Sequence, residues 1–186
     1  LDRELIESYL TKADIIIAHN ASFDRKFMEK IFSHACIKPW GCSATQINWK
    51  AEGFEGSRLG YLVASAGFFY DRHRALNDCY AAIELLARPL PKSKLFALGV
   101  LLENARRSSW RIWASHAPFE LKDKLRRRGY RWASGENGGH RAWFIDVPSE
   151  GKELEFKYLE GEIYGREPPI HMKRIDAYDR FSERAE

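Results

Sequence analysis

The sequence predicts an α/β protein with a small α+β module toward its C-terminal end. An apolar, β-branched run at 14–19 leads directly into a helical pattern at 23–33, and a buried strand followed by a helix is half of a β-α-β unit. After residue 108 the pattern predicts a strand, a helix and two further strands. The 186 residues are 45% hydrophobic, which is enough for a real core and excludes wholesale disorder.

The other elements of the first 107 residues follow from apolar residues spaced three or four positions apart, the spacing of one helix face. A second short strand is expected near 41–47. In the clearest helix, Leu76, Cys79, Ile83 and Leu86 form the stripe expected beside the core. The expected helices are 2–11, 23–33, 57–67, 74–87 and 94–107.

The second half of the chain is expected to form a module and a tail. Within the module, a strand at WRIWASH, a helix at PFELKDKLRRR and two strands around a Gly-rich turn make a β-α-β-β unit. The tail is expected to be helical around LEFKYLEGEIY and loosely structured afterwards. The predicted segments are 1–90, a connecting helix at 91–107, the module at 108–147 and the tail at 148–186.

Charge is unevenly distributed along the chain, whose net charge is +4. The module at 108–147 holds 8 basic and 4 acidic residues, whereas the tail at 148–186 holds 7 basic and 10 acidic residues. A basic stretch of this kind favours a local anionic partner such as nucleic acid, and the alternative is a solvated helix face.

Composition argues against several classes of protein. No apolar run is long enough to cross a membrane, and no charged-then-apolar leader opens the chain. The three cysteines form no C-x-x-C pair, so we expect a reducing, cytoplasmic setting. The histidines lack metal-ligand spacing, so no zinc site is expected. Because the chain begins with Leu1 and its first methionine is Met28, we expect a fragment of a longer protein.

The first segment with chemical potential is AHNASFD, in which Asp24 follows the predicted strand at 14–19 and opens a helix. Ligands of open parallel sheets gather at the carboxyl ends of the strands, and a helix N-terminus stabilises negative charge there. The alternative is that Ser22 or Asp24 only caps the helix.

The second segment is HRALNDCYAA, with His73 before a helix and Asp78 inside it. The positions around Asp78 on its own helix face hold alanines, which leave room beside the carboxylate. The alternative is a surface aspartate and a histidine that merely starts the helix.

Together, H-N-A-x-F-D ending at Asp24 and H-x4-D ending at Asp78 resemble the second and third motifs of the DEDDh 3′–5′ exonucleases. This family includes the proofreading epsilon subunit of bacterial DNA polymerase III. The resemblance covers residues 1–90 and implies a ribonuclease H-like fold. It further implies metal-dependent hydrolysis of nucleic acid from the 3′ end, with DNA as the expected substrate, in proofreading or repair.

The resemblance also implies roles for individual residues. Asp78 would hold the metal ion that activates water, Asp24 would support a second ion, and His73 would act as general base. The ions would be Mg²⁺ or Mn²⁺, because hard cations prefer carboxylate oxygens. His19, Asn20 and Phe23 would lie near the terminal nucleotide.

The first motif of the family, a D-x-E on an opening strand that supplies two of four carboxylates, is missing here. The letters D-R-E at 2–4 fall in a predicted helix, so we reject them as that motif. Two interpretations remain: a fragment of an exonuclease, or a non-catalytic relative that binds nucleic acid. The stretch 39–79 also resembles bacterial exonuclease-like proteins in which a segment similar to 117–144 follows, although this implies no role for that segment.

Basic and aromatic residues alternate in the module, as expected for single-stranded nucleic acid, where aromatic rings stack on bases and arginines meet phosphates. The alternative places the tryptophans in the core of the module, and we favour it for Trp113 and Trp143. The expected partners are a single-stranded DNA 3′ end, RNA as an alternative, and a polymerase subunit bound through the acidic tail. The arginines expected at the nucleic-acid backbone are Arg126, Arg127, Arg128 and Arg131.

Overall fold

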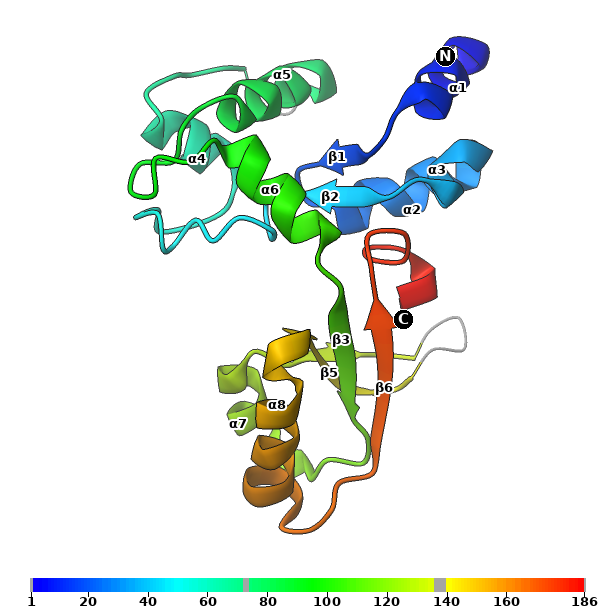
Figure 1. Ribbon diagram of the computed structural model, residues 1–186, viewed down its shortest axis with the longest axis vertical. Helices are drawn as coiled ribbons and strands as arrows, with labels where there is room; N and C mark the ends of the chain where they lie inside the picture. Colours follow the sequence, from blue (N-terminus) through cyan, green and yellow to red (C-terminus); the bar gives the residue numbers. More distant parts are fainter. Residues whose placement is uncertain (1, 72–73, 136–139, 186) are drawn as a thin grey trace. The chain divides into compact units, whose positions relative to one another are not determined.

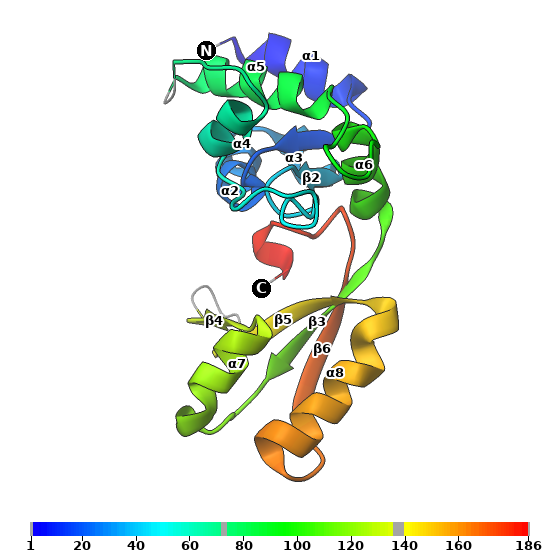
Figure 2. The ribbon, with the colours of Figure 1, turned by 90° about the vertical axis from the view of Figure 1, so that its left-hand side faces the viewer.

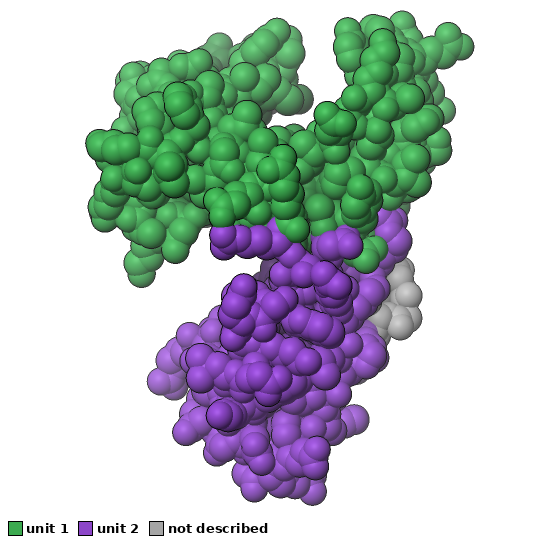
Figure 3. Space-filling view, viewed as in Figure 1, with its two compact units in different colours: residues 1–106, 177–182 green, residues 107–176, 183–186 purple. Residues whose placement is uncertain are grey.

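The computed structural model describes residues 2–71, 74–135 and 140–185. The chain forms two compact units, drawn in separate colours in Figure 3: unit 1 is residues 1–106 and 177–182, and unit 2 is residues 107–176 and 183–186. Helices and strands occur together in the fold, and the larger sheet is antiparallel, so the expected mixture of α and β structure is confirmed. No helix in the described part of the chain is long and apolar enough to cross a membrane.

Unit 1 is built around two short parallel strands (Figure 1). Ile16 of β1 pairs with Trp40 of β2, and Ala18 pairs with Cys42. Two helices, α2 and α3, lie between these parallel strands, so the strand-to-helix pattern at 14–33 does form part of a β-α-β unit, although β2 ends sooner than the strand expected at 41–47. The elements are α1 (Arg3–Lys12), β1 (Ile16–Ala18), α2 (Ala21–Ile31), α3 (Ser33–Ile37), β2 (Trp40–Cys42), α4 (Leu59–Ser65), α5 (Ala75–Leu86) and α6 (Ala97–Arg106).

Both faces of β1 contact apolar cores, as a strand of a parallel sheet requires. Ile17 packs against a cluster that includes Leu62 and Leu101, and Ile16 packs against a second cluster that includes Trp40. The strand itself is only half-buried. The reason is that, among the described residues, β1 has β2 as its only strand partner, so its other edge lacks a neighbouring strand.

The helix face predicted to lie beside the core in α5 is exposed instead, and so is the apolar stripe of α2. In α5 the side chains of Leu76 and Ile83 are 64% and 63% exposed, and the helix buries Ala81, Leu85 and Leu86. The apolar stripe of α2, formed by Phe23, Phe27 and Ile31, is likewise exposed. The expected core stripe of α5 is therefore wrong for all but Leu86, because no described element covers the rest of it.

Unit 2 is a four-stranded antiparallel sheet with the strand order β4-β5-β3-β6, seen with α7 and α8 in Figure 2. The predicted β-α-β-β unit is confirmed. The tail contributes a further strand, β6, from residues that we expected to be loosely structured, because β6 pairs along the whole length of β3. The elements are β3 (Ser109–Ala114), α7 (Lys122–Arg128), β4 (Arg131–Ala133), β5 (Ala142–Pro148), α8 (Lys152–Tyr158), a π-helix (Leu159–Tyr164), β6 (Ile170–Ile175) and short 3₁₀ turns at Phe119–Leu121, Ser149–Gly151 and Glu183–Ala185.

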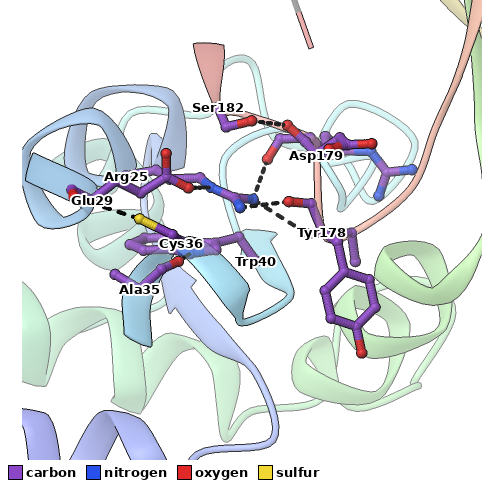
Figure 4. A network of polar contacts seen from close by, with 10 residues as sticks. Arg25, Glu29, Ala35, Cys36, Trp40, Tyr178, Asp179 and Ser182 are labelled. Atoms are coloured by element: carbon purple, nitrogen blue, oxygen red, sulfur yellow. Dashed lines mark hydrogen bonds and ion pairs between the residues drawn. The ribbon is translucent and has the colours of Figure 1, made fainter. Parts of the chain in front are cut away.

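One buried arginine ties the returning segment 177–182 to the rest of unit 1 (Figure 4). The side chain of Arg25 is 0% exposed and donates hydrogen bonds to the carbonyls of Ala177, Tyr178 and Arg180 at 3.3, 2.6 and 2.7 Å. Its Nε also pairs with Glu29 at 2.6 Å. A buried charge is tolerated only when it is paired and hydrogen-bonded, and Arg25 meets both conditions.

Candidate functional site

Asp24 lies in the first turn of α2, just beyond the carboxyl end of β1. The residue at the N-cap is Asn20, in a left-handed conformation with φ 72°, and it makes no capping hydrogen bond through its side chain. The hydroxyl of Ser22 contacts the Asn20 side chain at 3.3 Å. The capping alternative is therefore wrong for both Ser22 and Asp24, since neither occupies the N-cap position.

Burial raises the pKa of Asp24 above its ordinary value, and this effect outweighs a hydrogen bond from its own backbone and the charge of nearby His19, which lower it. The carboxylate is half-buried. It is thus a partly desolvated acid at the end of a parallel strand, inside the first turn of the helix and not at its N-cap.

His19 lies at the end of β1, where both of its ring nitrogens are engaged. Nε2 donates to the Ser57 carbonyl at 2.8 Å, and Nδ1 accepts from the Ser43 hydroxyl at 2.9 Å. This assignment of the proton follows from the carbonyl, which can only accept. Burial lowers the pKa of His19, against the raising effects of the Ser57 carbonyl and Asp24, and so favours the neutral ring. Sequence reasoning missed both serines, which lie far from His19 in the sequence.

The two other residues predicted to lie near a terminal nucleotide are exposed. Asn20 is exposed beside Asp24, and Phe23 is 62% exposed. The ring of Phe23 contacts that of Phe27 with centroids 5.0 Å apart. Because Asn20 and Phe23 are exposed, a nucleotide could reach both, and their contact with one stays a prediction.

Asp78 lies in the first turn of α5 and is half-buried. The hydroxyl of Tyr70 donates to its Oδ1 at 2.8 Å, a contact that sequence reasoning did not foresee. Of the neighbouring alanines, Ala81 is buried and Ala75 is exposed. The predicted general base, His73, lies outside the described residues.

Asp24 and Asp78 have separate sets of contacts, the first with His19 and the second with Tyr70. Within the described residues, no three His, Cys, Asp or Glu side chains are grouped so that they could hold a metal ion. Two aspartates fit Mg²⁺ or Mn²⁺ in kind, because hard cations prefer carboxylate oxygens. They do not fit in number, since a two-ion site needs further carboxylates.

In unit 2, two of the four arginines predicted at a nucleic-acid backbone pair with acids of the same unit that are buried or partly buried. Arg128 donates to the buried Glu155 at 3.0 Å, and Arg131 donates to Asp146 at 3.0 Å. Burial and the neighbouring Glu155 raise the pKa of Tyr130, whose hydroxyl donates to Glu155 at 2.9 Å. Arg126 and Arg127 remain exposed.

Trp113 and Trp143 are both predicted to lie in the core of the module. Trp113 is 1% exposed and Trp143 packs against the core of unit 2, so both core assignments are confirmed. Trp113 also contacts His140 and His171, whose rings lie 4.1 Å apart although the two residues are distant in the sequence.

Comparisons of the chain with known protein families, with curated proteins and with solved structures found no match. A functional assignment therefore depends on the residues and on their geometry.

Removing the charge of Asp24 should stabilise the chain in the absence of divalent ions. A raised pKa means that the folded state favours the protonated carboxyl, so stability is lost as the pH rises through the folded-state pKa. We expect Asp24→Asn to raise the thermal unfolding midpoint at pH 7, with the gain shrinking as the pH falls toward the ordinary value of 3.8. Circular dichroism against temperature measures this, with the exposed Asp14→Asn as control. A lower midpoint for Asp24→Asn at pH 7 would show that the carboxylate makes a stabilising contact.

Proposed function

We propose that unit 1 belongs to a metal-dependent 3′–5′ exonuclease of the ribonuclease H-like fold, acting on DNA. One observation carries the proposal: Asp24 is a half-buried carboxylate at the carboxyl end of a parallel strand, where burial raises its pKa and where Asn20, not Asp24, occupies the N-cap position. A carboxylate kept in such a place at a cost in stability is typical of a functional site.

Hydrogen bonds that orient the candidate side chains also support the proposed exonuclease site. Ser43 and Ser57 fix the ring of His19 beside Asp24, and Tyr70 fixes one oxygen of Asp78. Side chains locked by neighbouring hydrogen bonds are what a pre-organised site requires. Divalent ions, when bound, would stabilise both the attacking and the leaving oxygens of a phosphodiester. The role proposed for His73 is to accept the proton of the attacking water.

The carboxylates that the described residues lack would come from a strand carrying D-x-E that pairs with the edge of β1 that has no strand partner among the described residues. Figure 3 shows unit 1 hollowed between the part formed by α4 and α5 and the part formed by α1, and Figure 1 places β1 at the base of this hollow. Both flanking helices expose apolar side chains: Leu5 and Tyr9 on α1, and Leu76, Tyr80 and Ile83 on α5. A strand edge without a described strand partner, near helices that expose apolar side chains, is suited to accept a further strand.

The nuclease assay uses a 5′-labelled single-stranded oligonucleotide with Mg²⁺ or Mn²⁺, and a chelator as control. We expect the chain as it stands to be inactive or nearly so, because too few carboxylates are present. A strand-completed chain, in which the opening strands of a DEDDh exonuclease with their D-x-E are joined ahead of α1, should give a metal-dependent ladder. A folded strand-completed chain without a ladder would reject the proposal.

A second candidate is a relative that binds nucleic acid without cutting it. The observation that favours it is the lack, within the described part of the chain, of any group of three potential metal ligands. This candidate predicts DNA binding that weakens with salt, together with an inactive strand-completed chain.

A further inference from the structure

We propose that unit 2 binds single-stranded DNA on one side of α7 and the edge strand β4. We call this surface the aromatic flank, and it consists of Phe119, Lys122, Arg126, Trp132 and Trp143. In it, Phe119 and Trp132 stack on bases while Lys122 and Arg126 contact phosphates. Contacts within unit 2 support the existence of this binding surface, and only the choice of DNA as its ligand rests on the proposed exonuclease function.

Two large aromatic side chains of this surface remain in contact with solvent. Phe119 is 72% exposed and Trp132 is 51% exposed. Removing such rings from water is favourable, so their joint exposure in a small unit favours a surface that a partner covers. Trp132 stands on β4, an edge strand of the sheet.

Helix geometry separates the aromatic flank from the side of α7 that packs within unit 2. Phe119 lies in the 3₁₀ turn that runs directly into α7, and Lys122 and Arg126 follow at spacings of three and four, so the three residues share one side. Lys124 and Arg128 lie on the other side, where they pair with Glu162 and Glu155. The cations of the aromatic flank are thus distinct from those used to hold the fold together.

Basic and aromatic groups alternate along the aromatic flank. The Nζ of Lys122 lies 4.0 Å from the ring centre of Phe119, and the Arg126 guanidinium lies 5.7 Å from that of Trp143. Trp143 in turn meets Trp132 edge to face, with ring centres 5.5 Å apart. A single strand offers bases and phosphates in the same alternation, since rings stack on bases and cations meet the backbone.

The charges of the surrounding residues support this choice of cations. The ion pair of Arg126 is an exposed contact of 3.4 Å with Asp123, and the Arg126 side chain is 65% exposed. Arg131, by contrast, shares Asp146 with Arg111. Bringing Arg128 or Arg131 to a phosphate would break an ion pair with a buried or partly buried carboxylate, whereas Arg126 would give up an exposed one. Lys122 and Arg126 sit beside aromatic rings that can stay in place.

The test is fluorescence anisotropy of a labelled oligo(dT) of about 15 nucleotides, the upper end of common site sizes, with chelator present so that cleavage is excluded. We expect Trp132→Ala and Phe119→Ala each to weaken binding at least about fivefold, as for a lost base stack. Arg126→Gln should weaken binding and lower the salt slope of log K by about 0.7, one released counterion on a single strand. The matched controls are Arg174→Gln on the opposite edge strand β6 and Leu154→Ala on α8, both exposed, and they should bind as the parent does.

Trp132→Phe is the control for misfolding in Trp132→Ala. It keeps a ring that can stack on a base, so it should retain most of the affinity. Equal binding by Trp132→Ala and the parent would overturn the proposal, and so would duplex DNA bound as tightly as the single strand. An RNA strand of the same length that binds more tightly would overturn the choice of DNA. Failure here is separable from failure of the proposed function, because this binding is measured with chelator present and needs neither metal nor cleavage, whereas the proposed function is judged by the nuclease ladder.

Discussion

Asp78→Asn should lower the rate of metal-dependent degradation by the strand-completed chain at least about 10³-fold. A bound cation contributes several kcal/mol to the stabilisation of charge at the reacting phosphate, and each 1.36 kcal/mol corresponds to a factor of about ten. Asparagine keeps the size of the side chain but removes the charge that holds the ion. Release of shortened products from a 5′-labelled single strand, resolved on a gel, gives the rate.

Two matched variants show whether the loss comes from the carboxylate itself. Tyr70→Phe removes the hydrogen bond to Asp78 and keeps the ring, so we expect a loss of about fivefold, the equivalent of about 1 kcal/mol. The exposed Asp14→Asn changes the charge equally and should leave the rate unchanged. Full activity of Asp78→Asn would remove this residue from the proposed site.

Arg25→Met should destabilise unit 1 by about 3–5 kcal/mol, the usual cost of removing one partner from a buried ion pair. The substitution removes the arginine that pairs with Glu29 and the side-chain donor to three carbonyls of segment 177–182. The Ala177 carbonyl keeps the backbone N–H of Trp40 as a donor. The substitution also removes a cation that lies 5.5 Å from the ring of Trp40. Urea unfolding followed by tryptophan fluorescence measures the free energy of unfolding.

The matched control for Arg25 is Arg88, which pairs with Glu84 four residues before it and donates to the Ala66 carbonyl. Its side chain is 41% exposed, so Arg88→Met should cost less than about 1 kcal/mol. Limited proteolysis adds a second measurement, since the Arg25 variant should release the end of the chain earlier. Equal stability of the two variants would show that Arg25 does not anchor segment 177–182.

Local patterns were enough to predict most helices and the β-α-β-β unit. Helix α1 at Arg3–Lys12 matches the expected 2–11 because capping and apolar spacing are local properties, and Asp2 accepts the capping hydrogen bond of Leu5. The same holds for α7, which ends at Gly129 with φ 104°, a left-handed conformation that glycine adopts without strain.

Features that depend on distant partners could not be predicted. Strand β6 is held by its pairing with β3, which starts about 60 residues earlier, far beyond the range of any periodicity. The pairing of Arg128 with Glu155 joins two helices whose packing no local pattern specifies. The spacing of Leu76 and Ile83 correctly indicates a helix with an apolar stripe, but spacing alone does not say whether another element covers that stripe.

The candidate site could likewise be predicted from the sequence only in part. The position of Asp24 after β1 follows from a strand-to-helix pattern in the sequence, as does that of Asp78 in α5. The groups that orient the site do not, because Ser43, Ser57 and Tyr70 lie in loops without a sequence signature. Loops are where side chains far apart in sequence meet around a rigid scaffold.

The measurement that tests the central claim most directly is a count of Mn²⁺ ions bound to the strand-completed chain, by electron paramagnetic resonance of the free ion. A two-ion site formed in part by Asp24 and Asp78 predicts two tightly bound ions in the parent chain. It predicts loss of tight binding in the double variant Asp24→Asn, Asp78→Asn, with the exposed Asp14→Asn unaffected. Equal Mn²⁺ binding by the parent and the double variant would contradict the account.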